Sequence, residues 1–185
     1  KIVRLNDDGT VPQQNPFQGK GELAKTFWTT GHRNLLGIAF DQKNNLWANE
    51  MGPRHGDELN LIVAGSNYGW PLVSEGNHYS GALIPPHETR PDFASPVAYW
   101  VPTLAPSGLT FYIGNEFKNW EGHALLGGLK GKSLVRLKLR DQKVIEEERF
   151  SWRVRVRDVE VQKNGLIWVI EDGSDARLIK FSLPD

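Results

Sequence analysis

The residues best suited to binding chemistry lie between positions 31 and 70. Gly52-Pro53 predicts a sharp turn that exposes backbone carbonyls, and Asp57 and Glu58 supply carboxylates a few residues later. Carbonyl and carboxylate oxygens are the ligands that hard cations such as Ca²⁺ take in proteins. Alternatively, the loop is purely structural, and its carboxylates cap turns or pair with Arg54.

A second group consists of cations near expected strand ends. Arg153, Arg155 and Arg157 alternate along the chain, so a strand would carry all three on one face. Like charges on one strand face are unfavourable unless an anion or acidic residues neutralise them. Guanidinium groups bind phosphates and carboxylates bidentately, which favours a polyanionic ligand. The alternative is a solvated edge face that pairs with the acidic run 146–148.

The elements that must position these residues are short strands. One pattern is a strand, a polar turn and a further strand, seen at 37–47, 108–126 and 159–168. Asn164-Gly165 is its strongest turn signal, because both residues tolerate a positive φ. The other pattern is a strand of alternating apolar and polar residues. It occurs at 1–5, 58–62, 133–137 and 177–181.

Together these patterns predict an all-β fold of repeated antiparallel units, each of about 40–50 residues, as in the blades of a β-propeller. The count is one leading strand and three units, with a long insertion at 67–106 in the first. A two-sheet sandwich is the main alternative. Three blades close only half a ring, and the chain starts within a strand pattern. We therefore interpret residues 1–185 as a partial propeller domain, the C-terminal half of a larger one, unless two chains complete each other.

Composition excludes several function classes. Lys and Arg total 22 and Asp and Glu total 22, so no global field attracts nucleic acid. The absence of cysteine excludes disulfides, zinc-thiolate sites and iron–sulfur clusters. No apolar run approaches the roughly 20 residues of a membrane span.

The order of the motifs resembles that of a known family, the soluble quinoprotein sugar dehydrogenases. These six-bladed propellers use pyrroloquinoline quinone (PQQ) and Ca²⁺ to oxidise aldoses to lactones, and the short loops are closer to the aldose sugar dehydrogenase branch. The resemblance covers nearly the whole chain. It rests on the segments 31–34, 52–60, 67–71, 105–112, 128–130 and 155–158.

The resemblance implies site residues one by one. Cofactor contacts are expected at Arg33, Asn34, Tyr79, Gly128, Leu129, Lys130, Arg155, Val156 and Arg157. The carbonyls of Gly52 and Pro53 are expected to hold the Ca²⁺ that polarises the quinone. Glu58 and the backbone of Tyr68 match a second, structural Ca²⁺ site. Met51 departs from the polar residue that relatives often carry, which removes one expected cofactor contact.

The catalytic base of the family is a histidine, and none of the five histidines here lies in its sequence context. No catalytic residue is therefore assigned within the chain, and the base is expected upstream of Lys1. We expect His32 to make local contacts and the other four to be solvated. The implied partners are an aldose sugar, an external electron acceptor and the missing N-terminal half. The implied location is periplasmic or secreted.

Two other functions remain open from the sequence. One is a non-catalytic propeller that binds a partner or a glycan through an exposed aromatic surface formed by Trp100, Tyr79 and the insertion. The other is a Ca²⁺-dependent lactonase-type hydrolase, which needs several carboxylates and asparagines around one Ca²⁺.

Overall fold

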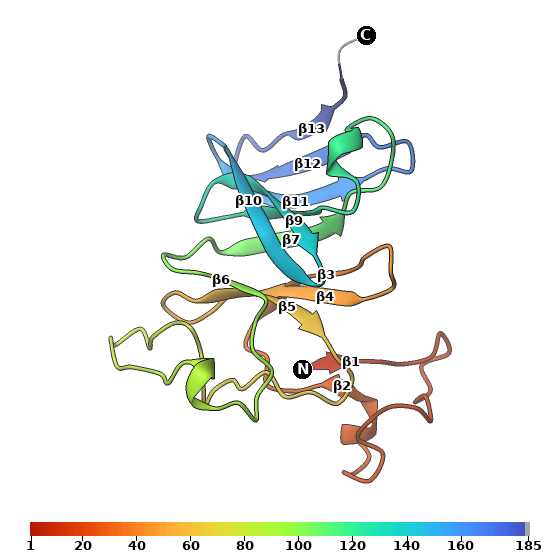
Figure 1. Cartoon of the computed structure of the whole chain (residues 1–185), viewed down its shortest axis with the longest axis vertical. Coiled ribbons are helices and arrows are strands. Elements are labelled where there is room, and N and C mark those ends of the chain that lie inside the picture. The colour runs from red at the N-terminus through yellow and green to blue at the C-terminus, as the bar shows by residue number, and fades with distance from the viewer. Residues whose placement is uncertain (184–185) are drawn as a thin grey trace.

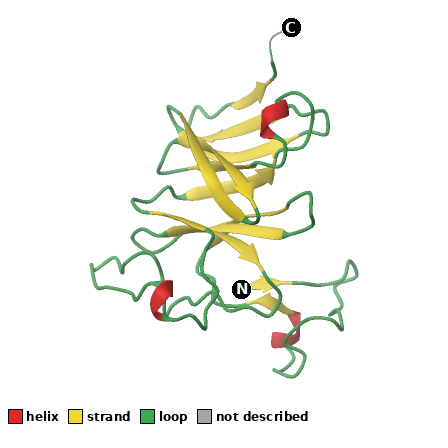
Figure 2. Cartoon of the chain, in the orientation of Figure 1, coloured by secondary structure: helices red, strands yellow, loops and turns green. Residues whose placement is uncertain are grey.

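The computed structural model describes residues 1–183, and strands dominate it (Figures 1 and 2). Four antiparallel sheets follow one another along the chain. The first pairs β1 (Ile2–Val3) with β2 (Phe27–Thr29). The second has the order β3 (Leu35–Phe40), β4 (Leu46–Glu50), β5 (Asp57–Ile62) and β6 (Ala98–Trp100).

The third sheet contains β7 (Pro106–Phe111), β8 (Ala124–Gly128), β9 (Ser133–Arg140) and β10 (Lys143–Ser151), and the fourth contains β11 (Arg155–Val161), β12 (Ile167–Asp172) and β13 (Leu178–Phe181). Three short 3₁₀ helices lie in the connections: η1 (Ala24–Thr26), η2 (His87–Thr89) and η3 (Lys118–Trp120). Within residues 1–183, no helix is long and apolar enough to span a membrane.

The sheets stack face to face, with β1 and β13 at opposite ends of the stack (Figure 1). The alternation of side chains along each strand explains how the third sheet serves two cores. Leu126 and Val135 point into one cluster, shared with the second sheet. Their chain neighbours Leu125 and Leu134 point into another, shared with the fourth sheet. A sheet buried on both faces requires neighbours on both sides, which is the blade arrangement of a propeller and not a two-sheet sandwich.

The first strands of the three larger sheets are neighbours, because β3 contacts β7 and β7 contacts β11. Hydrogen bonds join the three sheets at the level of these starts, and Asn49, near the end of β4, pairs with Gly37 of β3. Asn49 Nδ2 donates to the Ser107 carbonyl at 2.8 Å, and Ser107 Oγ donates to the Val156 carbonyl at 2.8 Å. The starts of these strands therefore lie at one shared end of the stack, which we call the site end.

The predicted strands are confirmed, although the first covers only Ile2–Val3 of the expected 1–5. The turn at Asn164-Gly165 is also confirmed, and Gly165 has a φ of +90°. Strands β2, β6 and β10 were not predicted. The expected placement of Arg153 is wrong, because β11 begins at Arg155 and Arg153 lies in a bend before it. A register shift between Val156 and Asp158 further interrupts the expected alternation.

Candidate functional site

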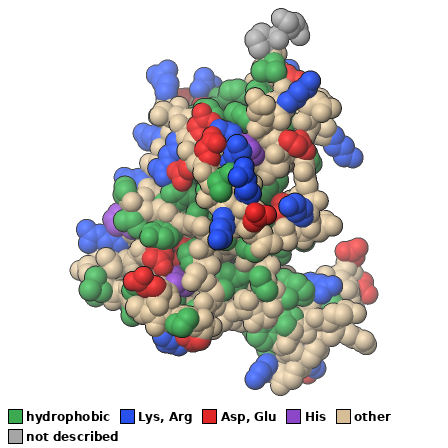
Figure 3. Space-filling view, in the orientation of Figure 1, with side chains coloured by type: hydrophobic (Ala, Val, Ile, Leu, Met, Phe, Trp, Pro, Cys, Tyr) green, Lys and Arg blue, Asp and Glu red, His purple; other side chains and the backbone are tan. Residues whose placement is uncertain are grey.

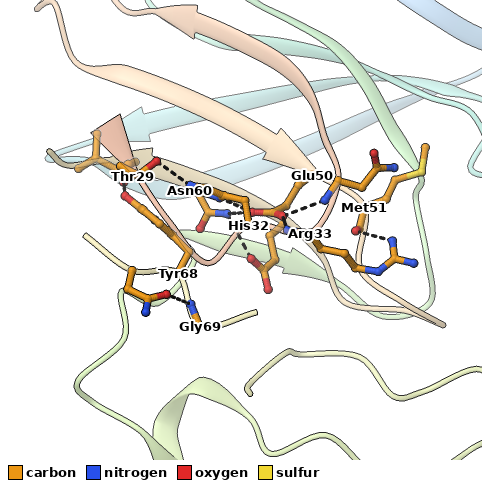
Figure 4. A network of polar contacts seen from close by, with 12 residues as sticks. Thr29, His32, Arg33, Glu50, Met51, Asn60, Tyr68 and Gly69 are labelled. Atoms are coloured by element: carbon orange, nitrogen blue, oxygen red, sulfur yellow. Dashed lines mark hydrogen bonds and ion pairs between the residues drawn. The ribbon is translucent and has the colours of Figure 1, made fainter. Parts of the chain in front are cut away.

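Glu50, at the end of β4, organises the turn that leads into β3 (Figure 4). Its Oε1 accepts a hydrogen bond from Asn60 Nδ2 at 3.0 Å and lies 2.8 Å from His32 Nδ1. Its Oε2 accepts from the backbone N–H of Arg33 at 2.7 Å and of Asn34 at 3.4 Å. A buried carboxylate with four partners thus fixes the backbone of two predicted cofactor-binding residues. No motif in the sequence indicated this role of Glu50.

His32 makes local contacts only, as predicted. Its Nε2 lies 2.9 Å from Thr29 Oγ1, and its ring stacks on Tyr68 with centroids 4.4 Å apart. Together with the contact to Glu50, these interactions engage both ring nitrogens and one ring face. His32 is therefore a structural part of the turn.

The side chain of Arg33 leaves this network and meets the insertion. Its guanidinium donates to the Met51 carbonyl at 3.0 Å and to the Tyr79 hydroxyl at 3.4 Å. It also lies 5.4 Å from the ring centroid of Trp70 and 5.9 Å from that of Tyr79. The fold therefore brings the predicted pair Arg33 and Tyr79 together, and Tyr79 is 73% exposed beside that cation.

The Gly52-Pro53 loop fits a cation bound through backbone oxygens. Among residues 1–183, no hydrogen bond is donated to either carbonyl. A Cβ on Gly52 would lie 2.1 Å from the His55 carbonyl oxygen, so the close folding of the loop requires glycine. The Gly52 N–H donates to Asp57 at 3.1 Å. Asp57 therefore caps the loop, one of the two roles that the sequence left open.

Glu58 lines a cavity of about 10 Å³, together with Glu50, Met51, Gly52, Tyr68 and others. That volume accommodates about one water-sized species. Burial, and then the charge of Glu50, raise the pKa of Glu58 to about 8. A cation bound in the cavity would stabilise the charged form of Glu58 and lower this pKa. The cavity therefore fits the second predicted Ca²⁺ site.

Two further observations bear on this site. The Tyr68 carbonyl already lies 3.1 Å from His87 Nε2, so a metal would use its remaining lone pair. Within residues 1–183, no three His, Asp or Glu side chains form a metal-binding group, and both predicted sites rely on backbone carbonyls.

The turn after β8 presents Lys130 to solvent. Gly128 and Leu129 are buried, and the Leu129 N–H donates to the Ala105 carbonyl at 2.8 Å. The Leu129 side chain therefore serves the packing of the turn. In this turn, a ligand could therefore contact only the exposed side chain of Lys130 and backbone atoms.

Arg155 and Arg157 converge on one carboxylate, because each lies within 2.9 Å of Asp172 Oδ2. The expected alternative pairing with the run 146–148 is wrong, since those carboxylates bind Arg136 and Arg149 instead. One acid facing two half-exposed arginines leaves a net positive charge. On the face shown in Figure 3, basic and acidic side chains are interspersed.

Other predictions need revision. Val156 is fully buried in the core and its carbonyl is bonded to Ser107, which limits any cofactor contact to its remaining backbone atoms. His87 and His123 are buried, so their expected solvation is wrong. Trp100 is 3% exposed and donates to Glu147, so it contributes nothing to an exposed aromatic surface.

The fold places the candidate residues together at the site end. Arg33 and Asn34 precede β3, Lys130 follows β8, and Arg155 starts β11. The cross-strand pairs Leu35↔Glu50, Pro106↔Gly128 and Arg155↔Asp172 fix this common level in three sheets. The arrangement combines four cations with a carbonyl loop, which suits a small polyanion bound beside a hard cation.

Comparison with known proteins assigns the family. The family model described as glucose/sorbosone dehydrogenase matches residues 1–180. The chain belongs to this family. Aldose sugar dehydrogenase YliI of Escherichia coli is 38% identical over 189 aligned residues, which cover 98% of this chain and 50% of that protein.

Solved structures confirm the propeller-type all-β fold. A glucose dehydrogenase crystal structure superposes with a TM-score of 0.93 at 38% identity, covering 100% of this chain and 55% of that one. The PQQ-bound aldose sugar dehydrogenase of Streptomyces coelicolor superposes with a TM-score of 0.73 at 30% identity, covering 97% of this chain and 51% of that one. The chain thus spans about half the length of these relatives.

Proposed function

We propose that this chain is the cofactor- and Ca²⁺-binding half of a PQQ-dependent aldose dehydrogenase. The observation that carries the proposal is the shared site end, where the cations Arg33, Lys130, Arg155 and Arg157 accompany the Gly52-Pro53 loop. PQQ carries carboxylates, which guanidinium and ammonium groups bind. The PQQ-bound relative supports this choice of polyanion.

The roles of the residues follow from their surroundings. Bound PQQ and Ca²⁺ would supply a two-electron acceptor and a Lewis acid for the oxidation of an aldose to its lactone. Arg155 and Arg157 would bind and orient the anionic cofactor, since Asp172 neutralises only one of the two. Arg33, which is held by Glu50 and Met51, would bind the cofactor from the start of the second sheet.

No group in the chain is assigned as the proton acceptor. His32 has both nitrogens engaged, and His87 has its own engaged by Glu75 and the Tyr68 carbonyl. We propose that a histidine of the N-terminal half of the propeller removes the proton of the sugar hydroxyl. The further partners are an aldose and an external electron acceptor, and the proposed location is periplasmic or secreted.

The test is dye-linked oxidation of aldoses by the chain combined with the N-terminal half of a relative, after loading with PQQ and Ca²⁺. We expect activity that requires PQQ and Ca²⁺ together. Hydrolysis of lactones without PQQ, or failure to bind PQQ even with the N-terminal half present, would refute the proposal. The first outcome would favour the lactonase-type alternative.

A further inference from the structure

Asp57 joins two parts of the candidate site that are far apart in sequence. This first residue of β5 is 1% exposed, and both carboxylate oxygens are engaged. Its Oδ1 accepts from the Gly52 N–H at 3.1 Å. Its Oδ2 accepts from Thr103 Oγ1 at 2.6 Å and from the Ala105 N–H at 2.7 Å. One buried side chain therefore holds both the Gly52-Pro53 loop and the segment 103–105 that leads into β7.

The segment that Asp57 holds also carries the Lys130 turn. The Ala105 carbonyl accepts from the Leu129 N–H at 2.8 Å, and the Leu104 carbonyl accepts from the Gly131 N–H at 2.9 Å. Ala105 has a φ of +50°, a left-handed conformation that is unfavourable for alanine. Its hydrogen bond to a charged acceptor offsets that cost.

We propose that Asp57 is a positioning residue, which fixes the Gly52-Pro53 carbonyls and Lys130 relative to each other. A cation on the carbonyls and an anion on Lys130 then lie at a set separation. Asp57 acts through the two loops and touches no ligand. The inference rests on the proposed function, since it assigns a ligand to each loop. Such supporting contacts are typically worth about 10–100-fold in affinity.

The test compares two substitutions in the same sheet. Asp57→Asn keeps the shape but replaces one acceptor oxygen with an amide group that cannot accept. Asp41→Asn is the matched control, because Asp41 also accepts from two backbone amides and from Trp47 Nε1, at the β3–β4 turn. Thr103→Val removes only the hydroxyl bond, and provides a milder variant if Asp57→Asn does not fold.

The first readout is amide hydrogen exchange of the ligand-free chain. We expect Asp57→Asn, and more weakly Thr103→Val, to speed exchange at Leu129 and Gly131, which Asp57 does not contact. Asp41→Asn should leave these amides unchanged. Unaltered exchange at both amides in the Asp57 and Thr103 variants would overturn the inference, as would equal acceleration in the control.

The second readout is the dissociation constant of PQQ in the presence of Ca²⁺. We expect about 10–100-fold weaker binding for Asp57→Asn and no change for Asp41→Asn. If the unaltered chain binds PQQ and Asp57→Asn binds it equally well, the inference is wrong. If neither binds, also with the N-terminal half present, the proposed function fails, while the exchange data still decide whether Asp57 links the loops.

Discussion

Glu50 and Glu58 form a directly opposed pair across β4 and β5, and Asn60 Nδ2 donates to both. Like charges placed opposite each other in a sheet are unfavourable. Glu50 is compensated by His32 and two backbone amides, whereas Asn60 is the single donor to Glu58 among the described residues. The two carboxylates should therefore respond differently to substitution and to pH.

Glu58 should make stability depend on pH. Its folded pKa of about 8 lies above the unfolded value, so the folded chain binds more protons in the window between them. Stability should consequently fall as pH rises through that window, by at most about 1.4 kcal/mol per pH unit. Ca²⁺ should stabilise the chain more at pH 8 than at pH 6, because at pH 6 it must displace a proton.

The measurement is the thermal midpoint against pH, with and without Ca²⁺, for the chain and for Glu58→Gln. The variant should lose both the extra slope and the stabilisation by Ca²⁺ at this site. Identical slopes in the two proteins would contradict the assignment of the cavity.

Glu50→Gln should destabilise the chain, because Glu50 accepts hydrogen bonds from Asn60 and from two backbone amides. The substitution replaces one acceptor oxygen with an NH₂ group, which cannot accept from the donors around it, at a cost of about 1–3 kcal/mol. Denaturant unfolding measures the loss. Glu88→Gln is the control, because Glu88 is exposed and should change stability by less than about 0.5 kcal/mol. A cost for Glu50→Gln as small as that of the control would show that the network is dispensable.

The family resemblance could name candidate residues that lie far apart in sequence, while their contact with a cofactor stays a prediction. Arg33 and Tyr79 were named as cofactor contacts, and the fold brings them together. Glu50 was missed because its partners lie 10–18 residues away and meet it only through strand pairing. His123 was misjudged because its buried partner Arg136 comes from the adjacent strand.

Among the elements, the turn before β3 depends most clearly on backbone geometry. Gly31 has a φ of +77°, and a Cβ there would lie 2.0 Å from Asn67 Oδ1 and 2.5 Å from the Gly69 nitrogen. This close approach is what holds the start of the insertion against the turn carrying Arg33. The strand pattern gave no indication of it.

Gly31→Ala should therefore cost more than the backbone strain alone. Gly9→Ala is the matched control, since Gly9 has a φ of +81° and no atom within 4 Å of a built Cβ. The control should cost about 1 kcal/mol, as for an alanine forced into the left-handed region. We expect at least about 1 kcal/mol more for Gly31→Ala in urea unfolding. Equal losses would contradict the packing described.

The sequence predicted the elements with a clear alternation and missed those without it. β10 includes the acidic run 146–148, which resembles a solvated face, yet it pairs with β9 along its length. β6 has three residues and lies within the insertion 67–106. Both complete four-stranded sheets, so their formation depends on the neighbouring strand more than on their own pattern.

Apolar side chains are exposed on two faces of the molecule, on β3 beside the short β1–β2 sheet and on the last sheet. Ile38 and Phe40 are 54% and 64% exposed on β3, and Ile170 and Leu178 are exposed on the last sheet. Since the chain spans about half of its relatives, we expect further blades to cover both faces. The repeat pattern predicted a half-ring, but it could not show which side chains these faces expose.

Ile38→Ser and Phe40→Ser together should reduce binding of a hydrophobic dye and self-association of the chain, because they remove two exposed apolar side chains from this face. Leu83→Ser is the control, since Leu83 is 82% exposed but lies in the insertion. Dye fluorescence and sedimentation velocity provide the measurement. An equal effect of the control would argue against an apolar docking face on β3.

Titration of PQQ into the chain combined with an N-terminal propeller half shows whether this chain supplies the PQQ and Ca²⁺ site. Arg155→Gln with Arg157→Gln is compared with Arg90→Gln, an exposed arginine that pairs with Asp92 and is not among the predicted cofactor contacts. We expect saturable binding that requires Ca²⁺, weakened at least tenfold by the double substitution and unaffected by the control. Absence of binding, or equal affinity in all three proteins, would contradict the account.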